Sequence, residues 1–189
     1  MPAHRPSRVA SALALAAVLG ATLAMPASAA DTVTQTINAG TLSSSIADLT
    51  LGDVFYSHSA QPSTGTMVLT ADDSSGSGDG WNVTVLSSDF DYVGLNGGTD
   101  IPAANFAITS ASVATSTAGE AVDATGGPKV PAGFTTPAAL DSARKTLQAD
   151  ANYGEGTYTQ DLGVSLSIPA QSRVGTYTGL LTVTISSSP

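Results

Sequence analysis

The chain has 189 residues, no cysteine and a formal net charge of −9, from 15 acidic and 6 basic side chains. Such an acidic surface excludes nucleic acid and anionic lipid headgroups as partners, because both require clustered Lys or Arg. The lack of cysteine excludes disulfides, lipid attachment at a cleavage site and Cys–His catalysis. Neutral glycans, cationic groups, divalent metals and other proteins stay open as partners.

The first 29 residues have the pattern of a cleaved signal peptide. Arg5 and Arg8 form a short basic region, residues 9–23 form an apolar run, and residues 27–29 (Ala-Ser-Ala) provide a cleavage site. The apolar run is shorter than the roughly 20 residues of a transmembrane anchor, so we expect secretion without membrane insertion. Cleavage leaves residues 30–189, which suffice for a single domain, and the loss of two arginines changes the net charge from −9 to −11.

The first half of the mature chain is rich in strand and turn formers, and helix patterns are nearly absent. Weak early strands are predicted at residues 33–37 and 46–51. Apolar and polar residues alternate at 65–71 and 81–86, on both sides of the polar loop 72–80. Alternation on either side of a glycine-rich loop predicts a β-hairpin.

The second half continues in the same way. Residues 104–113 predict a strand, residues 114–137 a long loop without periodicity, and residues 146–149 a short edge strand. The clearest alternation lies at 158–168, and a second one lies at 177–185. A compact turn separates these two segments, so they predict a terminal β-hairpin.

About eight short strands separated by turns predict an all-β fold, namely a single-domain antiparallel β-sandwich or a flattened barrel over residues 30–189. One early strand with a wet face should lie at the edge of a sheet. An unpaired edge is a place where another chain can add a strand.

The mature chain has no recognisable set of catalytic residues. Its single histidine, His58, lies between two serines without a strained nucleophile turn nearby. Glycoside hydrolysis needs only two carboxylates, but Glu120 and Glu155 lie in glycine-containing surface stretches and nothing distinguishes them as a pair. We therefore expect no enzyme activity and no cofactor.

A calcium site is the more serious alternative for the polar loop. Asp72, Asp73 and Asp79 place hard oxygen ligands close together in sequence. The calcium-loop pattern demands a glutamate at its twelfth place, however, and counting from Asp73 that place holds Thr84. A solvated acidic loop is the favoured interpretation.

Trp81, the single tryptophan, begins the strand that follows this loop. An exposed ring at this place could stack on a sugar, with its N–H as a hydrogen-bond donor. The alternative is a core residue that covers the end of the sandwich, and the spacing alone favours it.

Two segments resemble the signatures of WxL-domain surface proteins. Residues 79–85 (Asp-Gly-Trp-Asn-Val-Thr-Val) are similar to the first signature, a glycine followed by Trp-x-Leu at the start of a strand. Residues 168–185, from Ile-Pro-Ala to the final alternating stretch, are similar to the second signature, which closes the domain. Val83 replaces the leucine of the first signature, and Val183 replaces a tryptophan that many members carry in the second.

The resemblance covers about residues 40–189 and implies non-covalent attachment to peptidoglycan or an associated wall polymer at the Gram-positive cell surface. It also implies that the protein works beside other surface proteins. On this basis Trp81, Asn82 and Tyr177 are the candidate wall-binding residues, together with the loop 72–80. The alternative is a structural or adhesin subunit that docks with partner surface proteins through a sheet edge or face.

Overall fold

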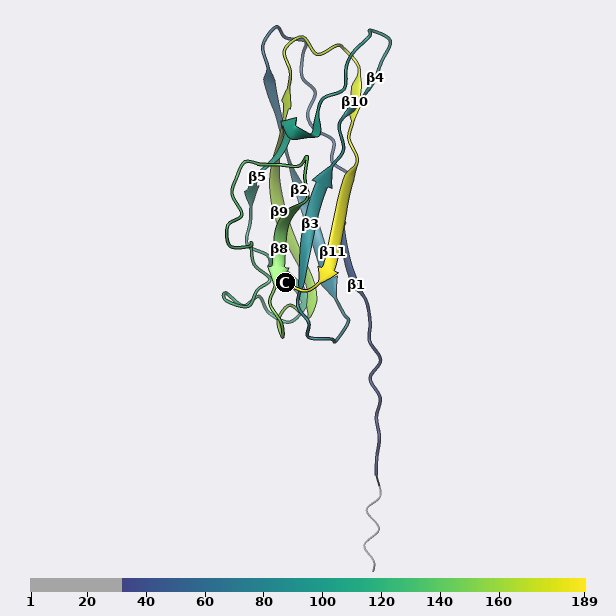
Figure 1. Cartoon of the computed structure of the whole chain (residues 1–189), viewed down its shortest axis with the longest axis vertical. Coiled ribbons are helices and arrows are strands. Elements are labelled where there is room, and N and C mark those ends of the chain that lie inside the picture. Colours follow the sequence, from purple (N-terminus) through teal and green to yellow (C-terminus); the bar gives the residue numbers. More distant parts are fainter. Residues whose placement is uncertain (1–31) are drawn as a thin grey trace, which may run out of the picture. The chain divides into compact units, whose positions relative to one another are not determined.

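The computed structural model describes residues 32–189, so the predicted signal peptide, residues 1–29, lies outside the described residues. Residues 37–189 form one unit, built from short and long strands (Figure 1). The elements are β1 (Leu42–Ile46), β2 (Gln61–Asp73), β3 (Trp81–Ser87), β4 (Asp91–Val93), a 3-10 helix (Ala103–Asn105), β5 (Phe106–Ala111), β6 (Thr115–Gly119), β7 (Ala138–Ala139), β8 (Arg144–Ala149), β9 (Gly156–Ile168), β10 (Thr176–Thr178) and β11 (Leu181–Ser187).

Two antiparallel sheets and one short ribbon contain these strands. The larger sheet has the order β1-β2-β9-β5-β7, and β6 also pairs with β9. The smaller sheet has the order β11-β3-β8, and β4 pairs with β10 in a two-stranded ribbon. The all-β antiparallel sandwich expected from the sequence is confirmed, and the sheets do not close into a barrel.

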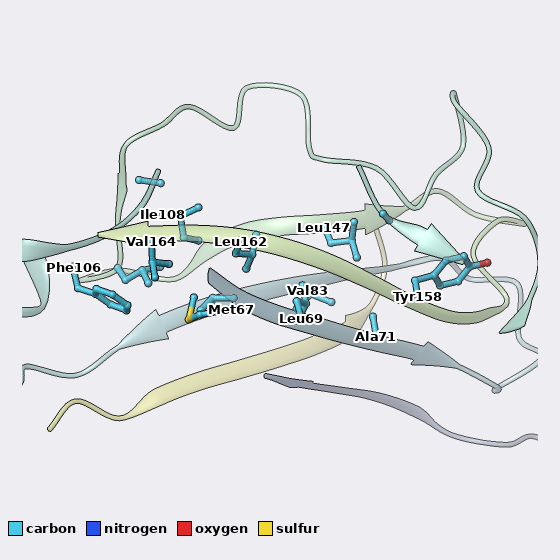
Figure 2. Close-up of a cluster of buried hydrophobic side chains, with 14 of the residues drawn as sticks. Met67, Leu69, Ala71, Val83, Phe106, Ile108, Leu147, Tyr158, Leu162 and Val164 are labelled. Atoms are coloured by element: carbon cyan, nitrogen blue, oxygen red, sulfur yellow. The ribbon is translucent and has the colours of Figure 1, made fainter. Parts of the chain in front are cut away.

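The core lies between the two sheets and follows from the period of two along each strand. β2 and β9 pair along their whole lengths, from Gln61 opposite Ile168 to Asp73 opposite Gly156. Successive side chains of a strand point to opposite faces, so alternate residues of β2, β3 and β9 enter the same layer. Burial of each large apolar side chain contributes about 1.5–3 kcal/mol. Figure 2 shows part of this layer, with Met67, Leu69, Ala71, Val83, Ile108, Leu147, Tyr158 and Leu162 labelled. Trp81 and Val85 are fully buried as well.

Both hairpins predicted from the sequence are wrong. β2 and β3 are consecutive along the chain but lie in different sheets, and the same is true of β9 and β11. The loop 74–80 therefore crosses from one sheet to the other and does not close a hairpin. Alternation shows which face of a strand is buried, but it carries no information about the neighbouring strand.

The remaining strand predictions hold in part. The first predicted strand, residues 33–37, has no regular structure, and the second is displaced to β1. β1 lies at the edge of the larger sheet, as expected for an early strand with a wet face. The strand predicted at 104–113 is β5, and β8 is the expected edge strand of the smaller sheet. The long segment 114–137 contains β6 at its start, which pairs with β9.

Candidate functional site

Trp81 is a core residue in this structure. None of its side chain is exposed, and its ring N–H donates a hydrogen bond of 2.9 Å to the backbone oxygen of Gly154. Its ring lies 6.1 Å from the ring of Tyr158, centroid to centroid. Stacking on a sugar requires an accessible ring face, and this arrangement offers none. The alternative that the sequence spacing favoured, a residue covering the end of the sandwich, matches the observed burial.

The loop that receives the Trp81 hydrogen bond is itself held by Glu120. The Glu120 carboxylate accepts a hydrogen bond from the backbone N–H of Gly154, at 2.8 Å, and its backbone oxygen accepts one from the hydroxyl of Tyr158, at 2.9 Å. Burial raises the pKa of Tyr158 to about 12, and the negative charges of Glu120 and Asp73 act in the same direction. Glu120, a carboxylate considered for catalysis, thus organises the surroundings of Trp81.

Stability is expected to fall between about pH 10 and pH 12 because of Tyr158. Its pKa is about 12 in the folded protein and about 10 in the unfolded chain, so the unfolded state loses the proton first. The contribution of the neutral hydroxyl is therefore fully present below pH 10 and is lost as the pH rises through the folded pKa. Denaturation midpoints measured from pH 9 to pH 12 should show this decline in the wild type. The decline should be smaller in Tyr158→Phe, and an equal decline in both proteins would contradict the assignment.

The three residues proposed for wall binding do not come together. Trp81 lies opposite Ser187, at the far end of β11. Its neighbour Asn82 is half-buried and donates a hydrogen bond of 2.6 Å to the backbone oxygen of Ser188. Tyr177 belongs to β10, which precedes the start of β11, so it lies beyond the opposite end of that strand.

Tyr177 forms an aromatic pair on the β4–β10 ribbon. It lies directly opposite Tyr92, and the two ring centroids are 5.2 Å apart. The Tyr177 hydroxyl donates a hydrogen bond to the backbone oxygen of Arg173, at 2.9 Å. Burial raises the pKa of Tyr177 above its ordinary value, and the neighbouring Tyr92 adds to the increase. The Tyr92 hydroxyl donates to the backbone oxygen of Val174, at 2.9 Å, so both rings support the segment that precedes β10.

The acidic residues considered for calcium do not form one site. β2 extends to Asp73, so Asp72 and Asp73 are strand neighbours whose side chains point to opposite faces. The buried Asp73 accepts hydrogen bonds from the backbone N–H and hydroxyl of Ser75, while Asp72 accepts one from Thr157, at 2.6 Å. Asp79 is exposed in the loop. Within residues 32–189, no group of three His, Cys, Asp or Glu side chains is placed to hold a metal ion.

Three loops adjoin one another at the end of the unit away from the C-terminus, next to β4 and β10 (Figure 1). We call residues 52–60, 94–100 and 169–175 the apical loops. The backbone N–H of Gln171 donates to the backbone oxygen of Ser57, at 2.8 Å, and this bond joins the first loop to the third. The side-chain amide of Asn96 donates to the backbone oxygen of Val174, at 3.0 Å, and joins the second to the third.

The apical loops carry large apolar side chains in solvent. Phe55 is 92% exposed, Leu95 is fully exposed and Val174 is 68% exposed. We call these three residues the apical patch. Further exposed or half-exposed apolar side chains on or beside the loops are Val54, Tyr56 and Val93.

The apical patch could not be predicted from the sequence, because its residues lie in segments without periodicity. The available signal was the presence of large apolar residues in stretches otherwise rich in Gly, Ser, Asn and Asp. His58 also lies in an apical loop, with its ring edge-on to Tyr56 at 5.3 Å. The observed contact of the His58 side chain is therefore with an aromatic ring.

A comparison with protein-family models assigns the chain to a family. The model of the WxL domain, described as a surface cell wall-binding domain, matches residues 21–189. The chain therefore belongs to the WxL family, and its place is the cell wall or cell surface. Searches of curated proteins and of solved structures gave no match. In the described part of the chain, no helix has the length and apolar character needed to cross a membrane.

Proposed function

We propose that this protein binds peptidoglycan or an associated wall polymer non-covalently and that the apical patch makes the contact. Family membership supports the broader function of wall binding at the cell surface. The observation that carries the finer proposal is the exposure of Phe55, Leu95 and Val174 on three adjoining loops. Large apolar groups exposed on adjoining loops at one end of a fold are typical of a binding surface.

The chemistry around the patch suits a neutral glycan. Sugar rings have apolar C–H faces and hydroxyl edges, so they match an apolar surface with polar groups beside it. Next to Leu95, Asn96 and Asp100 provide such polar groups, and the backbone N–H of Tyr92 donates to Asp100 at 2.7 Å. The net charge of the whole chain, −9, disfavours a ligand that is anionic along its whole length.

We also propose that the protein acts by binding and cleaves no bond in the polymer. The Glu120 carboxylate is occupied by two backbone N–H groups, those of Gly154 and Glu155, at 2.8 and 3.3 Å. These bonds give Glu120 a role in loop structure. Incubation with purified sacculi should release no soluble reducing sugar. Release that disappears on replacement of a single carboxylate would contradict this proposal.

Removal of the apical patch is expected to weaken sedimentation with purified Gram-positive sacculi by at least about tenfold. Each exposed apolar anchor at the centre of a contact contributes about 1–2 kcal/mol, so the double variant Phe55→Ser/Leu95→Ser should lose a tenfold factor or more. Neither side chain packs in the core, so circular dichroism should show an unchanged fold. The control is Val113→Ser, which removes a side chain that is 74% exposed between β5 and β6.

The same assay separates the two candidate functions. If the double variant binds sacculi as strongly as the wild type does, the apical patch does not make the contact. No sedimentation of the wild type would contradict wall binding and favour a subunit that docks with a partner surface protein. The edge position of β1 in the larger sheet supports that second candidate, because an edge strand can accept a strand from another chain.

A further inference from the structure

A pocket of about 390 Å³ opens beside the start of β8, and none of its lining residues belongs to the apical loops. Its lining includes the apolar residues Pro131, Phe134 and Pro137 and the basic residues Arg144 and Lys145. Phe134 also packs against the core, so this side of the pocket is anchored to the sandwich. Pockets of about 300–1,000 Å³ are the size of small-molecule sites, which combine apolar walls with a few polar groups.

The positive charge of this pocket contrasts with the rest of the described chain. Residues 32–189 contain 14 acidic side chains and four basic ones. Lys129 is neutralised by Asp150, with 2.5 Å between its ammonium nitrogen and the carboxylate oxygen. Two of the other three cations, Arg144 and Lys145, line this one pocket.

Both cations have hydrogen-bonding capacity left for a ligand. The Nε of Arg144 donates to the backbone oxygen of Ala139, at 2.7 Å, and this bond orients the guanidinium group. Its Nη2 lies 3.8 Å from a carboxylate oxygen of Asp141, and because both side chains are more than 40% exposed, that ion pair is weak. Within residues 32–189, Lys145 has neither an ion-pair partner nor a side-chain hydrogen bond.

We propose that this pocket binds an anionic group of the wall polymer, a carboxylate or a phosphate. The guanidinium fork of Arg144 matches the paired oxygens of either group, and the positive charge of its strand neighbour Lys145 adds electrostatic attraction. Phe134 and the two prolines pack against the apolar part of the ligand next to that group. The inference rests on the proposed function, because it supplies a second contact to the same polymer.

Calorimetric titration of the protein at low salt tests the pocket with two probes. N-acetylmuramic acid carries a carboxylate, and glycerol 3-phosphate carries a phosphate. At least one of them should bind saturably, and its identity shows which source of negative charge the pocket accepts. Affinity should fall at least tenfold in the double variant Arg144→Gln/Lys145→Gln and several-fold in the single variant Lys145→Gln. It should stay unchanged in Arg173→Gln, which removes the same charge from a residue that does not line this pocket.

Two results would overturn the inference: no saturable binding of either probe, or equal affinity in the wild type and the double variant. The single variant Lys145→Gln should fold normally, because no described side-chain contact depends on that ammonium group, so its affinity reports on binding alone. Sedimentation with sacculi is measured in parallel. A wild type that sediments without binding either probe would refute the pocket alone, and one that binds a probe without sedimenting would refute the wall-binding proposal alone.

Discussion

Replacement of Trp81 by alanine is expected to lower the free energy of unfolding by about 3–5 kcal/mol. The ring is completely buried between the sheets, packs beside Tyr158 and donates its N–H to the Gly154 carbonyl. The substitution leaves a cavity and a buried carbonyl without its donor. Because small domains have total stabilities of about 5–15 kcal/mol, this is a large part of the whole. Urea denaturation followed by circular dichroism measures the effect without requiring tryptophan fluorescence.

Trp81→Phe is the matched control for the packing term. It keeps an aromatic ring in the site but removes the N–H donor, so its cost should be about 1–3 kcal/mol. A Trp81→Ala protein with a wild-type unfolding midpoint and no affinity for sacculi would give the opposite conclusion. The ring would then be a contact residue, and its burial in the isolated chain would have to open on binding.

Replacement of Gly154 by alanine should have an effect of similar size, about 2–5 kcal/mol. Gly154 has φ of +81°, a conformation that residues with a Cβ atom rarely adopt. A Cβ atom there would lie 2.5 Å from the Cβ of Ala149 and 2.9 Å from Nε1 of Trp81. Strain and overlap therefore act together, and the overlap displaces the ring whose hydrogen bond Gly154 accepts. The measurement is again the unfolding midpoint in urea.

Gly76→Ala separates strain from overlap. Gly76 has φ of +65°, and a Cβ atom there would meet nothing within 4 Å. Its cost should be limited to the left-handed conformation, about 1–2 kcal/mol. If Gly154→Ala costs no more than Gly76→Ala, the close packing of Gly154 against Trp81 is contradicted.

The alternation of side chains along each strand was sufficient to predict the fold class. At 158–168 it identified β9 and most of its buried face, because the side-chain period of a strand is a local property of the backbone. The motif around Trp81 indicated the WxL family, and the family comparison confirms it. Gln160 is the exception on the buried face. It points inward and donates to the backbone oxygens of Ser112 and Thr146, so a polar residue occupies a core position only because carbonyls from other segments meet it there.

Tertiary structure alone decided which strands are neighbours and which side chains gather at a surface. The hairpin expected from β9 and β11 does not exist, because each strand pairs with a partner distant in sequence. The apical patch combines residues from three loops, and the pocket beside β8 combines a loop with the start of a strand. No local pattern contains such combinations, since long-range pairing depends on how whole faces pack. The sequence by itself determined the longer strands, their buried faces and the family. The packing of the two sheets determined which loops and side chains come together at the surface.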